Sequence, residues 1–156
     1  MRILFMCTAN SCRSILCEAM FNHLAPKGME ALSSGSFPKG QVLPRSLSTL
    51  QQAGIAIDGL YSKGNDAFEG NPPDIVITVC DKAAGESCPV YFGPALKAHW
   101  GLEDPSDVTG DESTVDAAFR ATLAHIQQRC EAFLALPLDT LSREALKVRL
   151  DEIGAL

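Results

Sequence analysis

The sequence predicts an α/β protein, a three-layer sandwich in which helices cover both faces of a central parallel sheet of about four strands. Short, continuous apolar runs, typical of strands buried on both faces, alternate with longer segments of helical periodicity. The length of 156 residues, with 46% hydrophobic and 21% charged residues, suits a single domain that spans residues 1–156. In such sheets, ligands bind beyond the carboxyl ends of the strands.

The first three elements follow from apolar runs and the residues that end them. Arg2 to Met6 is a continuous apolar run after its first residue and is expected to form a buried strand. A helix is expected from Ser14 to about Leu24, because Pro26 and Gly28 then end it. Met29 to Ser34 is expected to form the second strand.

The middle of the chain predicts one helix and two strands. Pro44 suits the first turn of a helix, and Gly54 can close it. Asp74 to Cys80 is the clearest strand, because it is rich in β-branched residues. A short strand is expected near residues 98–100.

The C-terminal part is expected to be helical. Apolar residues recur every three or four positions from Glu112 to Leu134, and Pro137 ends this helix. Ser142 to Ile153 has the pattern of a further short helix. Residues 138–156 would therefore form a C-terminal helical extension that packs onto the domain.

The charge and the N-terminus exclude several classes of function. A net charge of −6 argues against binding to nucleic acid or to a membrane surface. Only five apolar residues separate Arg2 from Thr8, fewer than a signal peptide needs, and no run approaches the roughly 20 apolar residues of a membrane span. We expect a cytoplasmic, monomeric protein whose six cysteines are mostly reduced unless redox chemistry is their task.

The most informative motif lies directly after the first strand, where residues 7–14 have the sequence CTANSCRS. A strand that leads through a small polar loop into a helix can bind a tetrahedral oxyanion, because the loop N–H groups and the helix N-terminus face the anion. The same field would hold Cys7 as a thiolate, and Arg13 could bind two oxygens at once. Cys7 alone could equally be a small buried apolar residue.

The spacing of Cys7 and Arg13, with Asn10 and Cys12 between them, resembles the low-molecular-weight tyrosine phosphatase family. The resemblance implies the fold of that family, with Cys7 as the nucleophile and Arg13 on the oxyanion. Ser14 would hydrogen-bond the sulfur, or would only cap the helix. The whole loop would bind the oxyanion through Thr8, Ala9, Asn10, Ser11, Cys12, Arg13 and Ser14.

Asp104, which precedes Pro105, matches the general acid of the same family. Alone, an Asp-Pro pair is usually a turn, but here it lies about a hundred residues after the nucleophile, as in the family. A carboxylic acid there would protonate the departing oxygen. Ser106 and Asp107 follow where phosphotyrosine phosphatases carry aromatic residues, which argues against an aryl phosphate substrate.

Cys80 and Cys88 distinguish between possible reactions. Cys80 ends the strand that begins at Asp74, so it is expected at the same edge of the sheet as Cys7. Cys88 lies on a polar loop with Gly85. The two cysteines could also be unrelated core residues, whereas a zinc site is disfavoured because no further Cys or His pair has ligand spacing.

With His99-Trp100-Gly101, these cysteines make the chain to about Leu136 resemble the thioredoxin-coupled arsenate reductases of this fold. The resemblance implies that Cys7 attacks the arsenic of arsenate, that Cys80 attacks Cys7, and that Cys88 attacks Cys80. Thioredoxin would reduce the final disulfide, phosphate or sulfate would act as substrate analogues, and no cofactor would be tightly bound. The alternatives are a low-molecular-weight phosphatase that hydrolyses phosphate monoesters, with redox-regulated cysteines, and a non-catalytic oxyanion-binding module.

Some members of this family bind a potassium ion beside the loop. Asn10, Glu18, Ser33 and Asp66 match the positions involved, whereas Gly64 stands where a threonine is expected. A cation site and ordinary hydrogen bonding are therefore both open interpretations.

The remaining cysteines are expected to be less important. Cys12 could protect Cys7 by pairing with it or could be a spectator. Cys17 and Cys130 have the apolar spacing of core residues.

Overall fold

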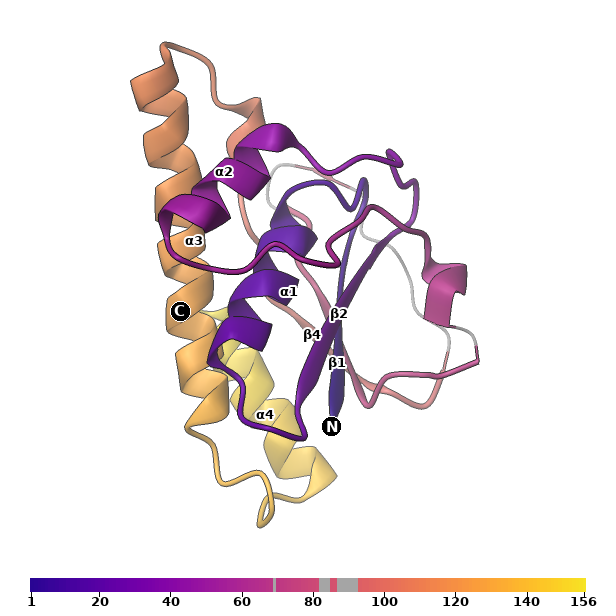
Figure 1. Cartoon of the computed structure of the whole chain (residues 1–156). Helices are drawn as coiled ribbons and strands as arrows, with labels where there is room; N and C mark the ends of the chain where they lie inside the picture. Colours follow the sequence, from indigo (N-terminus) through magenta and orange to yellow (C-terminus); the bar gives the residue numbers. More distant parts are fainter. Residues whose placement is uncertain (69, 82–84, 87–92) are drawn as a thin grey trace.

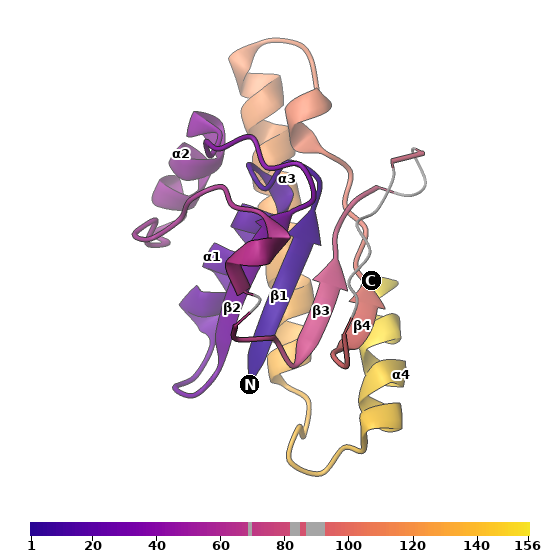
Figure 2. The same cartoon turned by 90° about the vertical axis from the view of Figure 1, so that its right-hand side faces the viewer.

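The computed structural model describes residues 1–68, 70–81, 85–86 and 93–156. A parallel sheet with the strand order β2-β1-β3-β4 lies at its centre. Figure 2 shows the four arrows side by side and pointing the same way. The strands are β1 (Arg2–Cys7), β2 (Glu30–Gly35), β3 (Ile75–Thr78) and β4 (Leu96–His99). The expected parallel sheet of four strands, flanked by helices, is confirmed.

The central position of β1 explains its continuous apolar sequence. It pairs with β2 on one side and β3 on the other, so that Phe5 lies between Ser33 and Ile77. Residues 3–7 of this strand are all buried. Cys7, its last residue, pairs with Gly35 at the carboxyl edge of the sheet.

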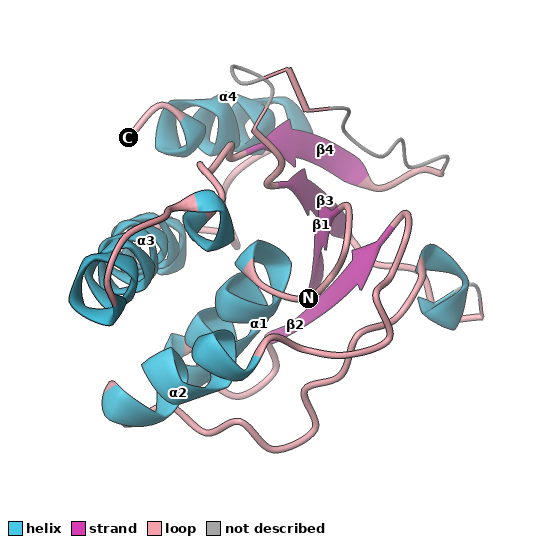
Figure 3. Cartoon of the chain, turned by 90° about the horizontal axis from the view of Figure 1, so that it is seen from above, coloured by secondary structure: helices cyan, strands magenta, loops and turns pink. Residues whose placement is uncertain are grey.

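The helices lie close to their predicted positions. They are α1 (Arg13–Leu24), α2 (Pro44–Gln52), α3 (Glu112–Leu134) and α4 (Arg143–Gly154). Figures 1 and 3 show α1, α2 and α3 together on one side of the sheet, with α1 between α3 and the strands. Two 3-10 helices that the sequence pattern does not predict, η1 (Asn65–Phe68) and η3 (Pro105–Asp107), complete the described elements.

Four buried aromatic rings tie these layers together. Phe5 of β1 contacts Phe21 of α1 and Trp100, with ring centroids 6.1 and 6.0 Å apart. The ring of Phe133 in α3 contacts the rings of both Phe21 and Trp100, with centroids 5.6 and 6.4 Å apart. Each tilted pair adds about 0.5–1.5 kcal/mol beyond the burial of its surface. This cluster fixes α1, and therefore the loop before it, against β1.

The C-terminal segment contacts both the sheet and helix α3. Helix α4 lies against β4, as Figure 2 shows, and buries Leu146, Leu150 and Ile153. The indole of Trp100 donates to the carbonyl of Leu150 at 3.0 Å. The buried Arg129 of α3 donates to the carbonyl oxygens of Gly154 and Leu156.

The opposite face of the sheet carries a second, smaller cluster. Leu4, Met6, Val76 and Ala95 are buried there, and Phe68 of η1 packs against them. Among the residues that the structure describes, none of the helices has both the length and the apolar character that a membrane crossing requires.

Candidate active site

The loop between β1 and α1 turns its carbonyl oxygens outward. Three of them accept N–H groups from the segment of residues 36–46, which wraps around the loop. The pairs are Thr8 with Phe37 (2.9 Å), Ala9 with Lys39 (3.0 Å) and Ser11 with Leu43 (3.1 Å). Because the segment of residues 36–46 binds these carbonyl oxygens, the N–H groups of the loop remain available to a ligand on its other side.

The inner side of the loop is suited to an anion. Within the described part of the chain, the N–H groups of Thr8, Ala9, Ser11 and Cys12 donate to no protein acceptor. Helix α1, which follows, has neither a capping side chain nor an acidic residue in its first turn. Unpaired N–H groups and a bare helix N-terminus together favour a bound oxyanion.

Gly35 allows the loop to lie close to the end of β2. A Cβ atom at this position would be 2.5 Å from the carbonyl oxygen of Thr8 and 2.9 Å from the nitrogen of Asn10. Both neighbours are backbone atoms and cannot rotate away, so any side chain at position 35 would displace the loop.

A directed chain of hydrogen bonds lies behind the loop. Asn10 has a left-handed backbone, with φ of 48°, and its Oδ1 accepts the N–H of Lys63 at 2.9 Å. This contact fixes the orientation of the amide, so Nδ2 donates to Ser14 Oγ at 2.8 Å and to Ser33 Oγ at 3.0 Å.

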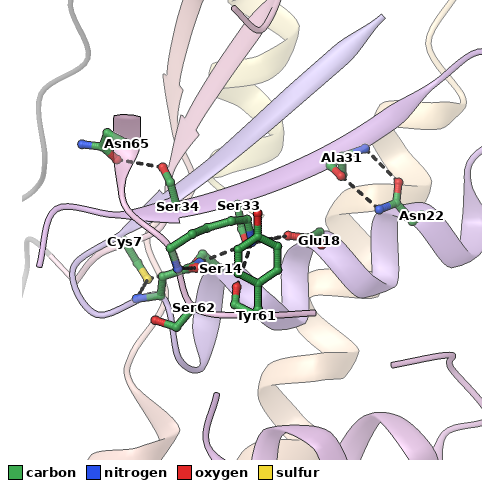
Figure 4. A network of polar contacts seen from close by, with 12 residues as sticks. Cys7, Ser14, Glu18, Asn22, Ala31, Ser33, Ser34, Tyr61, Ser62 and Asn65 are labelled. Carbon is green, nitrogen blue, oxygen red and sulfur yellow. Dashed lines mark hydrogen bonds and ion pairs between the residues drawn. The ribbon is translucent and has the colours of Figure 1, made fainter. Parts of the chain in front are cut away.

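Each hydroxyl that accepts from this amide keeps its own hydrogen for a second partner. Ser14 Oγ lies 2.8 Å from Cys7 Sγ and donates to the sulfur when Cys7 is a thiolate, which has no hydrogen of its own. Ser33 donates to Glu18 Oε1 at 2.6 Å in the same way. Figure 4 shows Cys7, Ser14, Ser33 and Glu18 in this chain. A thiolate at Cys7 would therefore receive two donors, the hydroxyl of Ser14 and the N–H of Asn10 at 3.3 Å.

Lys63 supplies the cation of this cluster. Its Nζ lies 3.4 Å from Glu18 Oε1 and 3.4 Å from Ser33 Oγ, and it donates to the carbonyl of Tyr61 at 2.9 Å. Burial lowers the pKa of Lys63, and the charge of Glu18 opposes that shift. A potassium ion beside Asn10, Glu18 and Ser33 does not fit this arrangement, because the lysine ammonium already lies there. The sequence pattern gave no sign of this lysine.

Arg13 lies at the front of the loop, where two carboxylates meet it. Its Nη1 and Nη2 donate to Glu86 Oε2 and Oε1 at 2.6 and 2.8 Å, a bidentate pair. Asp104 Oδ2 lies 3.4 Å from Nη2. The hydrogen bonds from Arg13 outweigh burial and lower the pKa of Glu86 to about 2. Sequence reasoning missed Glu86, which lies 73 positions from Arg13 in a loop without periodicity.

Asp104 lies where a proton donor is expected. It caps the N-terminus of η3, and its Oδ1 accepts the N–H and the hydroxyl of Ser106 at 2.9 and 2.6 Å. This leaves Oδ2 directed towards Arg13. The structure thus brings Asp104 to Arg13, which one short loop joins to Cys7 at the end of β1.

The other cysteines differ in their settings. Cys80 is fully buried two residues beyond β3, beside β1, and is disulfide-bonded. Cys88 lies outside the described residues. Burial raises the pKa of Cys12 and of Cys130 to about 12, and it raises that of Cys17 well above its ordinary value. These three thiols are therefore poor nucleophiles.

Comparison with known proteins finds relatives among enzymes that act on phosphotyrosine and arsenate, as an oxyanion-binding loop would suggest. The family model for low molecular weight phosphotyrosine protein phosphatase matches residues 2–147. The arsenate reductase of Bacillus subtilis is 30% identical over 131 residues, which cover 84% of this chain and 93% of that protein. The arsenate reductase of Bacillus licheniformis is 31% identical over the same shares of the two chains.

Solved structures show the same similarity. The crystal structure of arsenate reductase from Archaeoglobus fulgidus superposes with a TM-score of 0.71 at 27% identity, covering 86% of this chain and 99% of that one. An arsenate reductase in a phosphate-binding state gives 0.68 at 26% identity, over 86% and 96% of the two chains. The chain belongs to the low molecular weight phosphotyrosine protein phosphatase family, and within it the chain resembles the arsenate reductases.

Proposed function

We propose that this protein reduces arsenate to arsenite. The observation that carries the proposal is the meeting of Arg13 and Asp104 beside the loop that follows Cys7, whose N–H groups at four positions donate to no acceptor among the described residues. The similarity to arsenate reductases over more than four-fifths of the chain supports the same activity. We further propose that residues 1–156 act as one domain and as a monomer in the cytoplasm.

The first step is a nucleophilic substitution at arsenic. The Cys7 thiolate attacks the arsenic atom while the loop N–H groups and Arg13 hold the equatorial oxygens. Asp104 gives its proton to the departing hydroxyl group of arsenate, which leaves as water. The product is an arsenic(V) adduct on Cys7.

The second step transfers two electrons to arsenic. Cys80 attacks the sulfur of Cys7, the electron pair of the sulfur–arsenic bond passes to arsenic, and arsenite leaves. Cys88 then attacks Cys80 and releases Cys7 as a thiolate. Thioredoxin reduces the remaining Cys80–Cys88 disulfide. Cys80 lies beside β1 at the same sheet edge as Cys7, which supports this order of attack.

A coupled assay tests the proposal. NADPH oxidation is followed with thioredoxin, thioredoxin reductase and arsenate, and we expect arsenate-dependent turnover by the wild type. Cys88→Ser is expected to stop after a single turnover, because the Cys7–Cys80 disulfide then lacks its resolving thiol. Cys130→Ala is the matched control, since its thiol is buried and its raised pKa keeps it neutral.

The competing function is hydrolysis of phosphate monoesters. Rapid hydrolysis of an aryl phosphate that Cys80→Ser leaves unchanged, without arsenate-dependent NADPH oxidation, would favour the phosphatase. Multiple turnover by Cys88→Ser at the wild-type rate would exclude the three-cysteine relay.

A further inference from the structure

The carboxylate of Glu86 makes the contacts that an oxyanion would make. Its two oxygens receive both terminal nitrogens of Arg13, at 2.6 and 2.8 Å. Oε1 also accepts the hydroxyl of Thr8, a loop residue, at 3.0 Å. Two oxygens on one carbon, held bidentately by arginine, imitate two oxygens of a tetrahedral anion.

Glu86 is also held from its own side of the site. Its Oε2 accepts the N–H of Asp81 at 2.8 Å, and its own N–H donates to the carbonyl of Asp81 at 3.0 Å. Asp81 directly follows Cys80, which is disulfide-bonded. The position of the carboxylate is thus linked to the backbone next to a cysteine of the proposed relay.

We propose that Glu86 is an internal competitor for the oxyanion, which occupies Arg13 while Cys80 is disulfide-bonded and leaves it when that disulfide is reduced. The inference rests on the proposed function, because it concerns the oxyanion site of that reaction. Its consequence is that phosphate and arsenate bind Arg13 more weakly until the enzyme has been reduced again.

Competition of this kind has a predictable size. If Glu86 occupies Arg13 in about nine molecules of ten, the apparent affinity for an oxyanion falls about tenfold, because only the open fraction binds. Since Arg13 and Glu86 form a charge-assisted bidentate pair, the closed fraction should be at least that large.

The test measures binding of inorganic phosphate by calorimetry, which requires no turnover. The wild type and Glu86→Gln are compared after oxidation with diamide and after reduction with dithiothreitol. Oxidised Glu86→Gln is expected to bind phosphate at least tenfold more tightly than the oxidised wild type. Reduction should tighten binding by the wild type and change that of the variant less than threefold.

Two control variants test whether the effect comes from the carboxylate of Glu86. Glu103→Gln removes the same charge from an exposed position on the neighbouring loop, and it should bind phosphate within twofold of the wild type. Glu86→Asp keeps the charge but shortens the reach by one methylene, so it should bind more tightly than the wild type even if Glu86→Gln folds poorly.

A purely structural role for Glu86 predicts the opposite result. Phosphate affinity of oxidised Glu86→Gln and Glu86→Asp that is equal to or weaker than that of the wild type overturns the proposal. So does a wild-type affinity that reduction leaves unchanged. Because the readout is phosphate binding, it stands apart from the NADPH assay that tests arsenate reduction.

Discussion

The two sides of the anion-binding loop carry ion pairs of different construction, and the carboxylates at the front are the more exposed. Behind the loop, the Lys63–Glu18 pair belongs to a chain in which each hydrogen bond fixes the direction of the next. At the front, Glu86 and Asp104 both meet Arg13, and Glu86 comes from a distant part of the chain. The rear contacts set a geometry that must persist, whereas the front contacts can be exchanged for a ligand.

The largest loss of activity should come from changing Arg13, at the front of the loop. Arg13→Lys keeps the charge but loses the planar pair of donors, so kcat/KM for arsenate should fall by about 10²–10³-fold. Steady-state kinetics in the thioredoxin-coupled assay measures this loss. Arg45→Lys is the control and should retain wild-type kinetics, because Arg45 of α2 pairs with Asp116 of α3. More than a tenth of the activity left in Arg13→Lys would mean that the bidentate geometry is dispensable.

A free-energy change of about the same size should follow disruption of the Lys63–Glu18 pair behind the loop. Lys63→Met leaves the nearly buried Glu18 carboxylate without its ammonium, which should lower the free energy of unfolding by about 3 kcal/mol. Urea unfolding measures the change. The double variant Glu18→Gln/Lys63→Met should recover about half of it, because no unpaired charge remains. Equal stability of the single and double variants would show that the two groups are not coupled.

The smallest effect concerns the pH dependence of the front pair. The pKa of Glu86 lies at about 2 in the folded protein, below its ordinary value of 4.5, so the unfolded chain takes up the proton first as the pH falls. The wild type should therefore be more stable than Glu86→Gln above pH 4.5, by about 1 kcal/mol after solvent screening. This advantage should disappear as the pH falls towards 2.

Urea unfolding of both proteins at pH 7, 4 and 2.5, in the same redox state, tests this dependence. A stability difference that is constant across the three pH values would show that the Glu86–Arg13 ion pair does not contribute to stability.

Most of the fold could be predicted because its signals are local. The apolar run of residues 3–6 and the β-branched residues of β3 identify buried strands, and Pro44 and Pro137 mark where helices begin and end. The short helices η1 and η3 were missed, because three or four residues are too few to establish a period.

The part of the site that could be predicted is also the part with a local signal in the sequence. Cys7 and Arg13 are joined by one short loop, so their spacing alone places them together. Lys63 and Glu86 could not be found in this way, because each reaches the loop from a segment without regular periodicity, 53 and 73 positions from its partner. A lysine in such a segment is usually solvated, and only the tertiary contacts of Asn10 and Glu18 make it part of the buried cluster.

The outward carbonyls of the loop give the site a remote reporter. Among the described residues, the amides of Phe37, Lys39 and Leu43 donate to no other acceptor than those carbonyls, so their hydrogen-exchange rates depend on the loop keeping its shape. Nuclear magnetic resonance of these three amides would follow the integrity of the anion site without a ligand or a label inside it. The segment that wraps around the loop thereby makes its conformation observable from the protein surface.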